Sequence, residues 1–339
     1  MKNAVILFIL LFIFHSCREK EHSGKESAST QVSDSLLKTG GVRYIRLESG
    51  HQIWTKKVGH GPIKLLLLHD GPGLSHDYLQ CFEDFIQGTG IEIYYYDQLG
   101  CGNSDHPSDT ALWNISRFRE EVEEVRKALG LEQFYLFGHG WGGMLALEYL
   151  TAYQDNLKGA VISNATAGLH QDYKTSLLKK YLSGQEYQIM DSLSRVKSYQ
   201  TPQYQKILYS KFYSQTLCRM KPWPAPLLTS MAKSNFEQYR HMMGDNALAC
   251  EGNLLKWKRQ DTLRTLSLPC LVIGGKMDEV NPEVLKKEGR MMPNSRTIMC
   301  SQGSRMSLYD EQIRYFRELL RFLKETEEGT FTPDPLPES

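Results

Sequence analysis

The chain has 339 residues, which is long enough for one large domain with an insertion or for two ordinary domains, so a small disulfide scaffold is excluded. Its 40 Lys and Arg balance 39 Asp and Glu, and this balance predicts no strong field for a nucleic-acid backbone or an anionic membrane. Hydrophobic residues make up 41% and charged residues 23%, as in globular proteins with a sizeable core.

The first residues have the pattern of a targeting segment. Lys2 precedes an apolar run of 11 residues, from position 4 to 14, whereas a bilayer-spanning helix needs about 20. His15-Ser16-Cys17 follows the run, and Ser16-Cys17 resembles the site where bacterial lipoproteins are cleaved and acylated on the cysteine. Residues 1–17 are therefore interpreted as a lipoprotein signal peptide, which implies a lipid anchor in the bacterial cell envelope, on the periplasmic side or the outer surface. An ordinary secretory signal is the alternative.

Two further segments have compositions unlike a folded core. Residues 18–40 mix both charges with Ser and Thr and indicate a flexible tether. Residues 325–339 are acidic and contain three prolines, which predicts a disordered tail. The six cysteines after Cys17 show no metal-ligand spacing, so no metal site is expected, and their pairing stays open.

Strand and helix patterns alternate along the rest of the chain. Two strand-like runs joined at Ser49-Gly50 predict a hairpin over residues 42–58. Compact apolar runs suited to buried parallel strands follow at 63–68, 91–96, 133–137, 159–163, 269–273 and 296–300. Helical segments, such as 115–129 and 144–153, lie between them. The pattern predicts an α/β fold with a doubly wound, mostly parallel sheet.

About 100 residues separate the strand ending at 163 from the strand beginning at 269, far more than an ordinary crossover of ~10–30. This stretch predicts an inserted subdomain over 169–262, with helical spacing at 173–190 and 236–243. The predicted core then comprises residues 41–168 and 263–324.

Four motifs carry a family resemblance. They are His-Asp-Gly-Pro-Gly at 69–73, Tyr-Asp-Gln-Leu-Gly-Cys-Gly-Asn-Ser-Asp at 96–105, Gly-His-Gly-Trp-Gly-Gly-Met at 138–144 and Lys-Met-Asp-Glu-Val-Asn-Pro at 276–282. Together they resemble the proline iminopeptidase branch of the α/β-hydrolases, over residues 42 to 324. The resemblance implies an α/β-hydrolase fold in which the insertion is a helical cap, and no cofactor.

The catalytic positions implied by the resemblance are only partly retained. The chemistry of these hydrolases needs a serine in a G-x-S-x-G turn, an aspartate and a histidine. Gly140 stands at the serine position and Arg305 at the histidine position, whereas Asp278 retains the acid. Arg305 is expected to pair with Asp278, because a buried carboxylate needs a partner.

The resemblance also assigns an oxyanion hole to Asp70, Gly71 and Trp141. The family has glycine at position 70, so the Asp70 carboxylate would oppose negative charge that develops there. His139, beside the turn, is expected to be a packed histidine.

Three substrate-binding positions follow from the same resemblance. They are His69, Asp310 and Ala247, the last at the place of a glutamate in the family's cap. Asp245 and Glu251 are open alternatives for that glutamate.

These replacements decide the functional hypothesis. Losing a triad serine or histidine lowers turnover by a factor on the order of 10⁶. The sequence therefore favours an inactive pseudo-peptidase that binds a peptide or small molecule in its capped pocket. The alternative is an active aminopeptidase that releases N-terminal proline or another small residue through a displaced catalytic group. A dinucleotide fingerprint, Gly138-x-Gly140-x-x-Gly143, is rejected because it does not follow the first strand.

Overall fold

The structure is a computed structural model that describes residues 40–245 and 250–335. Cys17, the rest of the predicted signal peptide, the tether up to residue 39 and Ala247 lie outside the described residues.

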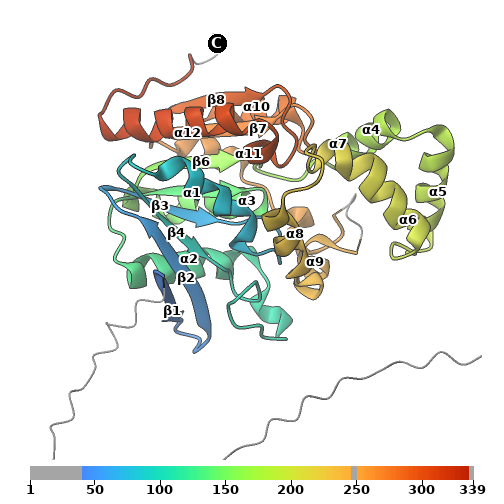
Figure 1. Ribbon diagram of the computed structural model, residues 1–339, viewed down its shortest axis with the longest axis horizontal. Coiled ribbons are helices and arrows are strands. Elements are labelled where there is room, and N and C mark those ends of the chain that lie inside the picture. The colour runs from blue at the N-terminus through green and yellow to red at the C-terminus, as the bar shows by residue number, and fades with distance from the viewer. Residues whose placement is uncertain (1–39, 246–249, 336–339) are drawn as a thin grey trace, which may run out of the picture. The chain divides into compact units, whose positions relative to one another are not determined.

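Within the described residues, eight strands form one sheet in the order β1-β2-β4-β3-β5-β6-β7-β8 (Figure 1). Their bounds are β1 Val42–Arg46, β2 Gln52–Gly59, β3 Ile63–Leu68, β4 Ile91–Tyr96, β5 Phe134–His139, β6 Leu157–Ser163, β7 Cys270–Gly275 and β8 Ser295–Cys300. β2 runs antiparallel to β1 and β4, and all pairings from β4 to β8 are parallel. The predicted doubly wound, mostly parallel sheet is confirmed.

The central strands are apolar on both faces because each face of the sheet carries a layer of helices. Leu65 and Leu67 of β3 pack in one cluster with residues of three helices, α1 (Glu83–Ile86), α11 (Ser307–Asp310) and α12 (Gln312–Glu327). Leu66 and Leu68 pack in a second cluster with residues of α2 (Ile115–Leu129), α3 (Trp141–Tyr153) and α10 (Pro282–Met291). Alternate side chains of one strand therefore enter two different cores, as a buried parallel strand requires.

The helices of the two layers have clear local signals. α2 begins where the Asn114 side chain accepts a hydrogen bond from the Arg117 N–H, and it ends at Gly130 with φ +68°. Its bounds are those predicted from the sequence.

The insertion between β6 and β7 is helical, as expected, and we call residues 169–262 the cap. Its helices are α4 Gln171–Tyr181, α5 Gly184–Arg195, α6 Pro202–Ile207, the π-helix η5 Leu208–Tyr213, α7 Ser214–Thr216, α8 Ala225–Ala232 and α9 Phe236–Met243. The stretch predicted as one helix over 173–190 is two, because Ser183 starts a new helix with a capping box to Glu186. A separate hydrophobic cluster, which includes Leu177 and Phe212, holds α4 to η5 together.

Residues 325–335, the described part of the tail predicted as disordered over 325–339, pack against the core. α12 continues to Glu327, and the Phe331 ring packs 5.3 Å from the Phe322 ring. The Asp334 carboxylate accepts a hydrogen bond from the Thr297 N–H of the edge strand β8 at 2.7 Å. Composition alone missed that these residues cover an otherwise open sheet edge.

The six described cysteines are buried, and they form no disulfide with one another. No described helix has the length and apolar character needed to span a bilayer.

Candidate functional site

The site is centred on the turn from β5 to α3. Gly140 has φ +57° and ψ −117°, a conformation that residues with a side chain rarely adopt. Its N–H donates to the Ser163 carbonyl, and its carbonyl accepts from the N–H of Gly143 and Met144. The chain therefore keeps the sharp strand-to-helix turn on which the family places its nucleophile, but without the nucleophile.

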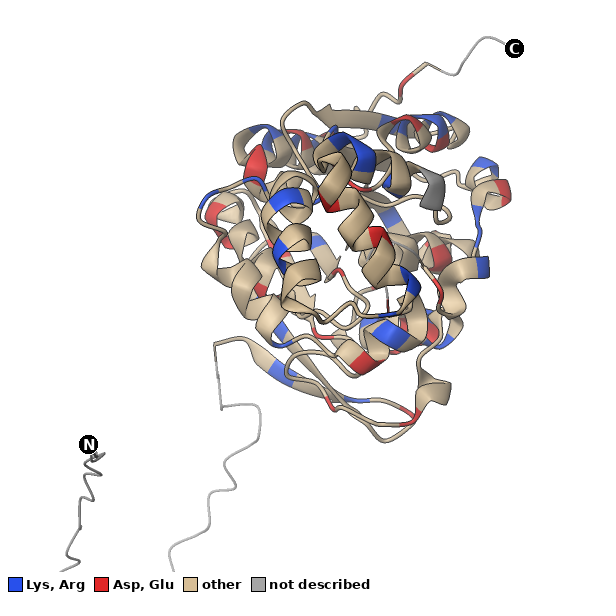
Figure 2. Cartoon of the chain, turned by 90° about the vertical axis from the view of Figure 1, so that its right-hand side faces the viewer, with Lys and Arg blue, Asp and Glu red and all other residues tan. Residues whose placement is uncertain are grey.

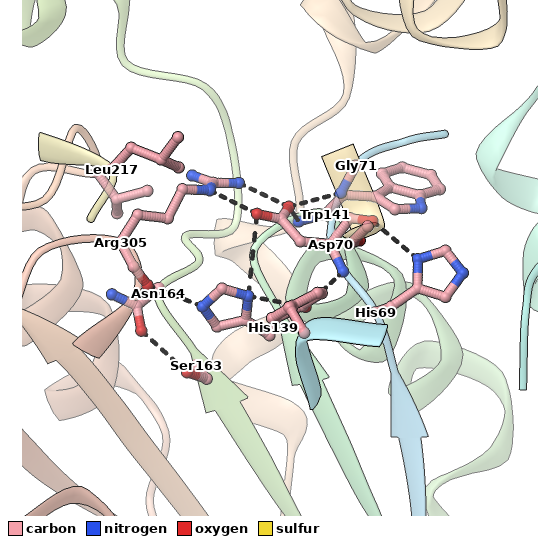
Figure 3. Close-up of polar contacts among 12 residues, drawn as sticks. His69, Asp70, Gly71, His139, Trp141, Ser163, Asn164, Leu217 and Arg305 are labelled. Atoms are coloured by element: carbon pink, nitrogen blue, oxygen red, sulfur yellow. Dashed lines mark hydrogen bonds and ion pairs between the residues drawn. The ribbon is translucent and has the colours of Figure 1, made fainter. Parts of the chain in front are cut away.

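The oxyanion hole is filled by the protein itself. Oδ1 of Asp70 accepts hydrogen bonds from the backbone N–H of Gly71 and of Trp141, both at 2.7 Å (Figure 3). Gly71 and Trp141 are two of the three residues, with Asp70, that the family resemblance assigns to the hole. A fixed carboxylate oxygen thus occupies the place where a reacting substrate would put its developing oxyanion.

The same carboxylate occupies the space of a nucleophile side chain. A Cβ built on Gly140 would lie 2.1 Å from Asp70 Oδ1 and 2.5 Å from an Arg305 guanidinium nitrogen. Real Cβ atoms essentially never approach other atoms within 3.0 Å. The glycine is therefore required by the position of the Asp70–Arg305 pair.

The predicted pairing of Arg305 with Asp278 is wrong. Arg305 donates from Nε to Oδ2 of Asp70 at 2.6 Å and from Nη2 to Oδ1 at 2.8 Å, a two-pronged ion pair (Figure 3). Asp278 instead accepts from Asn164 Nδ2 at 2.7 Å and from the Val280 N–H at 3.0 Å. Because position 140 has no side chain, the Asp70 carboxylate can occupy that space, where it binds the Arg305 guanidinium.

The two carboxylates differ in charge because their partners differ. Burial raises the pKa of Asp70, but the Arg305 charge and its hydrogen bonds outweigh burial and lower the pKa to about 2. Burial raises the pKa of Asp278 to about 7, against the opposing influence of the Arg305 charge and the Asn164 hydrogen bond. Asp70 is therefore fully ionised at neutral pH, whereas Asp278 is only partly ionised there.

His139 is fully buried and satisfied. Its Nε2 lies 2.8 Å from the Arg305 carbonyl and so carries the proton, and its Nδ1 accepts from the Tyr78 hydroxyl at 3.0 Å. The Tyr78 hydroxyl in turn accepts from the Asp70 N–H. Burial lowers the pKa of His139 to about 4, so the ring is neutral and holds the loops in place.

Two of the predicted substrate-binding residues order loops instead of lining the cavity. His69 donates from Nδ1 to the Asp70 carbonyl and accepts at Nε2 from the Gln98 N–H. The Asp310 carboxylate accepts from the N–H groups of Arg219 and Ser304. The hydrogen-bonding groups of both side chains have partners within the protein, and a role in substrate binding stays a prediction for both. The third, Ala247, is not described.

A cavity of about 790 Å³ lies between the turn and the cap. Asp70, Gly140, Trp141 and Arg305 line it from the sheet side, together with Glu279. From the cap, aromatic, methionine and leucine side chains dominate its wall; they include Tyr199, Tyr204, Tyr209, Tyr213, Tyr239, Leu208, Leu227, Met231 and Met243. The volume is in the range of sites that enclose a small molecule or a short peptide end.

Sequence reasoning missed two of the polar groups of this cavity. Glu279 follows the retained acid, and its Oε2 lies 3.3 Å from Lys174 Nζ and its Oε1 3.9 Å from an Arg305 nitrogen. The Tyr239 side chain comes from α9, where periodicity marks a helix but not the residue that reaches the site. Of the two open alternatives to Ala247, Asp245 lines the cavity and pairs with Arg240 at 2.6 Å, whereas Glu251 does not line it.

The geometry agrees with what comparisons with known proteins find. Residues 64–312 match the family model for the alpha/beta hydrolase fold. The chain is 40% identical over 280 residues to a proline iminopeptidase of Chitinophaga pinensis, covering 80% of this chain and 94% of that protein. It is 37% identical over 286 residues to a proline iminopeptidase of Elizabethkingia meningoseptica, covering 83% and 96%.

A solved structure leads to the same family. The proline iminopeptidase of Mycobacterium smegmatis superposes with a TM-score of 0.78 at 26% identity, covering 85% of this chain and 99% of that one. The chain therefore belongs to the α/β-hydrolase fold family, within its proline iminopeptidase branch.

Proposed function

We propose that this chain is an inactive member of its branch that binds a peptide or small molecule in the capped cavity without hydrolysing it. The observation that carries the proposal is the Asp70 carboxylate, held by both oxyanion-hole amides and by Arg305.

Electrostatics explains why this arrangement opposes acyl transfer. An oxyanion hole accelerates the reaction because its N–H groups stabilise negative charge that develops on the substrate oxygen, and losing one such donor costs about 10²–10³ in rate. Here both donors are engaged by a charge of the same sign as the oxyanion. This penalty adds to the absence of a serine and a histidine.

The replacements at positions 70, 140 and 305 are structurally interdependent. This favours a site that is stable in its present form over a hydrolase site that has merely lost catalytic residues. Gly140 makes room for the Asp70 carboxylate, Asp70 satisfies the two buried amides, and Arg305 balances the buried negative charge. A serine, a glycine and a histidine at these positions would form the hydrolase arrangement, whereas any one of them alone would leave a clash or an unpaired charge.

The ligand is proposed from the cavity and from the relatives. The relatives are named for an activity on N-terminal proline, which favours a peptide N-terminus or a small molecule of similar size. The mostly apolar wall with a few polar groups at the floor is typical of such sites.

We further propose that the chain is a lipoprotein of the bacterial cell envelope, anchored to the membrane through an acylated Cys17. The support is the sequence alone: a short apolar run, then Ser16-Cys17, then the tether.

An assay with chromogenic substrates tests the proposal. Proline 4-nitroanilide and 4-nitrophenyl acetate are incubated with the purified protein, and the dipeptide Pro-Ala is titrated by calorimetry and then recovered. We expect 4-nitroaniline and 4-nitrophenol to be released no faster than in buffer without protein. We expect the recovered Pro-Ala to be intact. The active aminopeptidase alternative requires turnover that saturates with substrate.

A further inference from the structure

The net charge of the chain is near zero, but its positive and negative residues are unevenly divided between the cap and the rest of the chain. The cap, residues 169–262, contains 14 Lys and Arg against seven Asp and Glu, whereas the whole chain contains 40 against 39. The cap therefore carries a formal charge of +7, and the rest of the chain is acidic. The prediction of no strong field for an anionic membrane rested on the charge balance of the whole chain, which does not show how the charges are distributed.

Much of the surplus positive charge is exposed and unpaired. Five cap lysines are exposed and have no carboxylate within ion-pair distance among the described residues: Lys179, Lys180, Lys197, Lys206 and Lys221. Most other described cap cations have an acidic partner, such as Lys211 with Glu186. Figure 2 views the molecule from the cap side and shows Lys and Arg on several of the helices that face the viewer.

Large apolar side chains are exposed on the same subdomain. In the described part of the chain, eight large hydrophobic side chains are exposed, and six of them belong to the cap: Val196, Tyr209, Met220, Leu228, Phe236 and Leu255. Where such side chains adjoin one another, they mark surfaces that contact something other than water.

The rim of the cavity brings the two features together. Phe236, which is 64% exposed, and Tyr209 line the cavity, as do Lys197 and Arg240. Lys206 precedes Tyr209 by three residues, at the end of α6 where the π-helix begins. Cationic and apolar side chains thus lie around one opening.

We propose that the cap docks on the surface of a bilayer that contains anionic lipids, with the opening of the cavity toward the lipid. Lysines beside exposed aromatic and aliphatic side chains match both parts of such a surface, the charged headgroups and the apolar layer beneath them. The proposed anchor at Cys17 favours a membrane over other partners, because only 23 residues, 18–40, separate that cysteine from the folded chain; a flexible linker of that length would span about 25–30 Å root-mean-square.

The expected effects are large enough to measure. Each Lys or Arg near an anionic surface strengthens binding by roughly fivefold, so removing two charges at the rim weakens it by about 30-fold. An inserted phenylalanine adds a factor of about 10 or more.

The test uses the chain from residue 17 onward with Cys17→Ser, so that no acyl group contributes. Binding is measured by co-sedimentation with vesicles of phosphatidylcholine alone and of phosphatidylcholine with phosphatidylglycerol. We expect binding only to the vesicles with phosphatidylglycerol, and loss of that binding as salt increases.

Matched variants locate the contact. Lys197→Gln with Lys206→Gln is expected to weaken binding about 30-fold. Lys276→Gln with Arg290→Gln removes the same charge from two exposed residues of the core that also lack a carboxylate partner in the described part of the chain, and should change binding by less than about threefold. Phe236→Ser should weaken binding, whereas Ile313→Ser, at a side chain 72% exposed on α12, should not.

Three results would overturn the proposal. The first is equal binding to both kinds of vesicle, and the second is an equal loss of vesicle binding in the two double charge variants. The third is binding to soluble polyglutamate without binding to vesicles, which would indicate an acidic protein partner. Since the tested chain lacks the lipid, these results do not depend on whether Cys17 is acylated. Membrane fractionation of the natural chain tests the anchor separately.

Discussion

Replacing Arg305 by alanine tests the ion pair at the centre of the site. The change leaves the Asp70 carboxylate buried with only the Gly71 and Trp141 amides as partners. Removing one member of a buried ion pair destabilises a protein by about 3–5 kcal/mol. Because the two amides remain, we expect a loss near the lower end, about 3 kcal/mol.

The pKa of Asp70 leads to a similar magnitude and adds a pH dependence. Lowering this pKa from 3.8 to about 2 corresponds to roughly 2.5 kcal/mol of stability at neutral pH. A lowered folded-state pKa stabilises above the unfolded value, so this contribution is present above about pH 4 and is lost as the pH falls toward 2. In Arg305→Ala only burial and the amides act, the carboxyl takes up a proton more readily, and the deficit relative to the natural protein should shrink as the pH falls from 7.5 to 4.5.

Thermal unfolding followed by circular dichroism measures both effects. At pH 7.5 we expect Tm to fall by about 5 °C or more, and by less at pH 4.5. Arg195→Ala is the control, because that side chain is 78% exposed, pairs with Asp191 at the surface and should be within about 1 °C of the natural protein. The reasoning is refuted if Arg305→Ala behaves like Arg195→Ala at both pH values.

Three further predictions concern the turn, the set of replacements and the anchor. Gly140→Ser should destabilise the protein by about 2–4 kcal/mol, because its Cβ meets Asp70 and its φ is positive, whereas Gly184→Ser, which has open space, should be near neutral in the same unfolding assay. Gly140→Ser with Arg305→His should remain inactive on proline 4-nitroanilide, because Asp70 still fills the hole; adding Asp70→Gly should produce a measurable initial rate, and equal rates in the two variants would argue against the filled hole. Cys17→Ala should move the protein out of the membrane fraction in cells, and an unchanged distribution would contradict the anchor.

Periodicity predicted the elements well where local sequence and burial agree. Strands such as β3 and β4 are continuous apolar runs because both faces are covered, and α2 has both a capping asparagine and a terminal glycine. These elements depend on residues near one another in the chain. The placement of Gly140, Asp70 and Arg305 in one site came instead from the family resemblance.

The partner of Arg305 could not be predicted in the same way. Asp70 and Arg305 are 235 residues apart, and both Asp70 and Asp278 were available carboxylates. The choice depends on the space left at Gly140, which only the folded chain shows. The covered edge of β8 is a similar case, because the composition of residues 325–335 suggested disorder and only their contacts with Phe322 and Thr297 revealed the docking.

The central claim is that an ionised Asp70 occupies the oxyanion hole, balanced by Arg305. The most direct measurement is an NMR titration of the Asp70 carboxyl carbon in protein labelled with ¹³C at aspartate, assigned by its absence in Asp70→Asn. We expect this carboxyl to stay ionised through most of the acid range, with a pKa of about 2. A midpoint at or above 3.8, the ordinary value for an aspartate, would contradict a carboxylate held in the hole by Arg305.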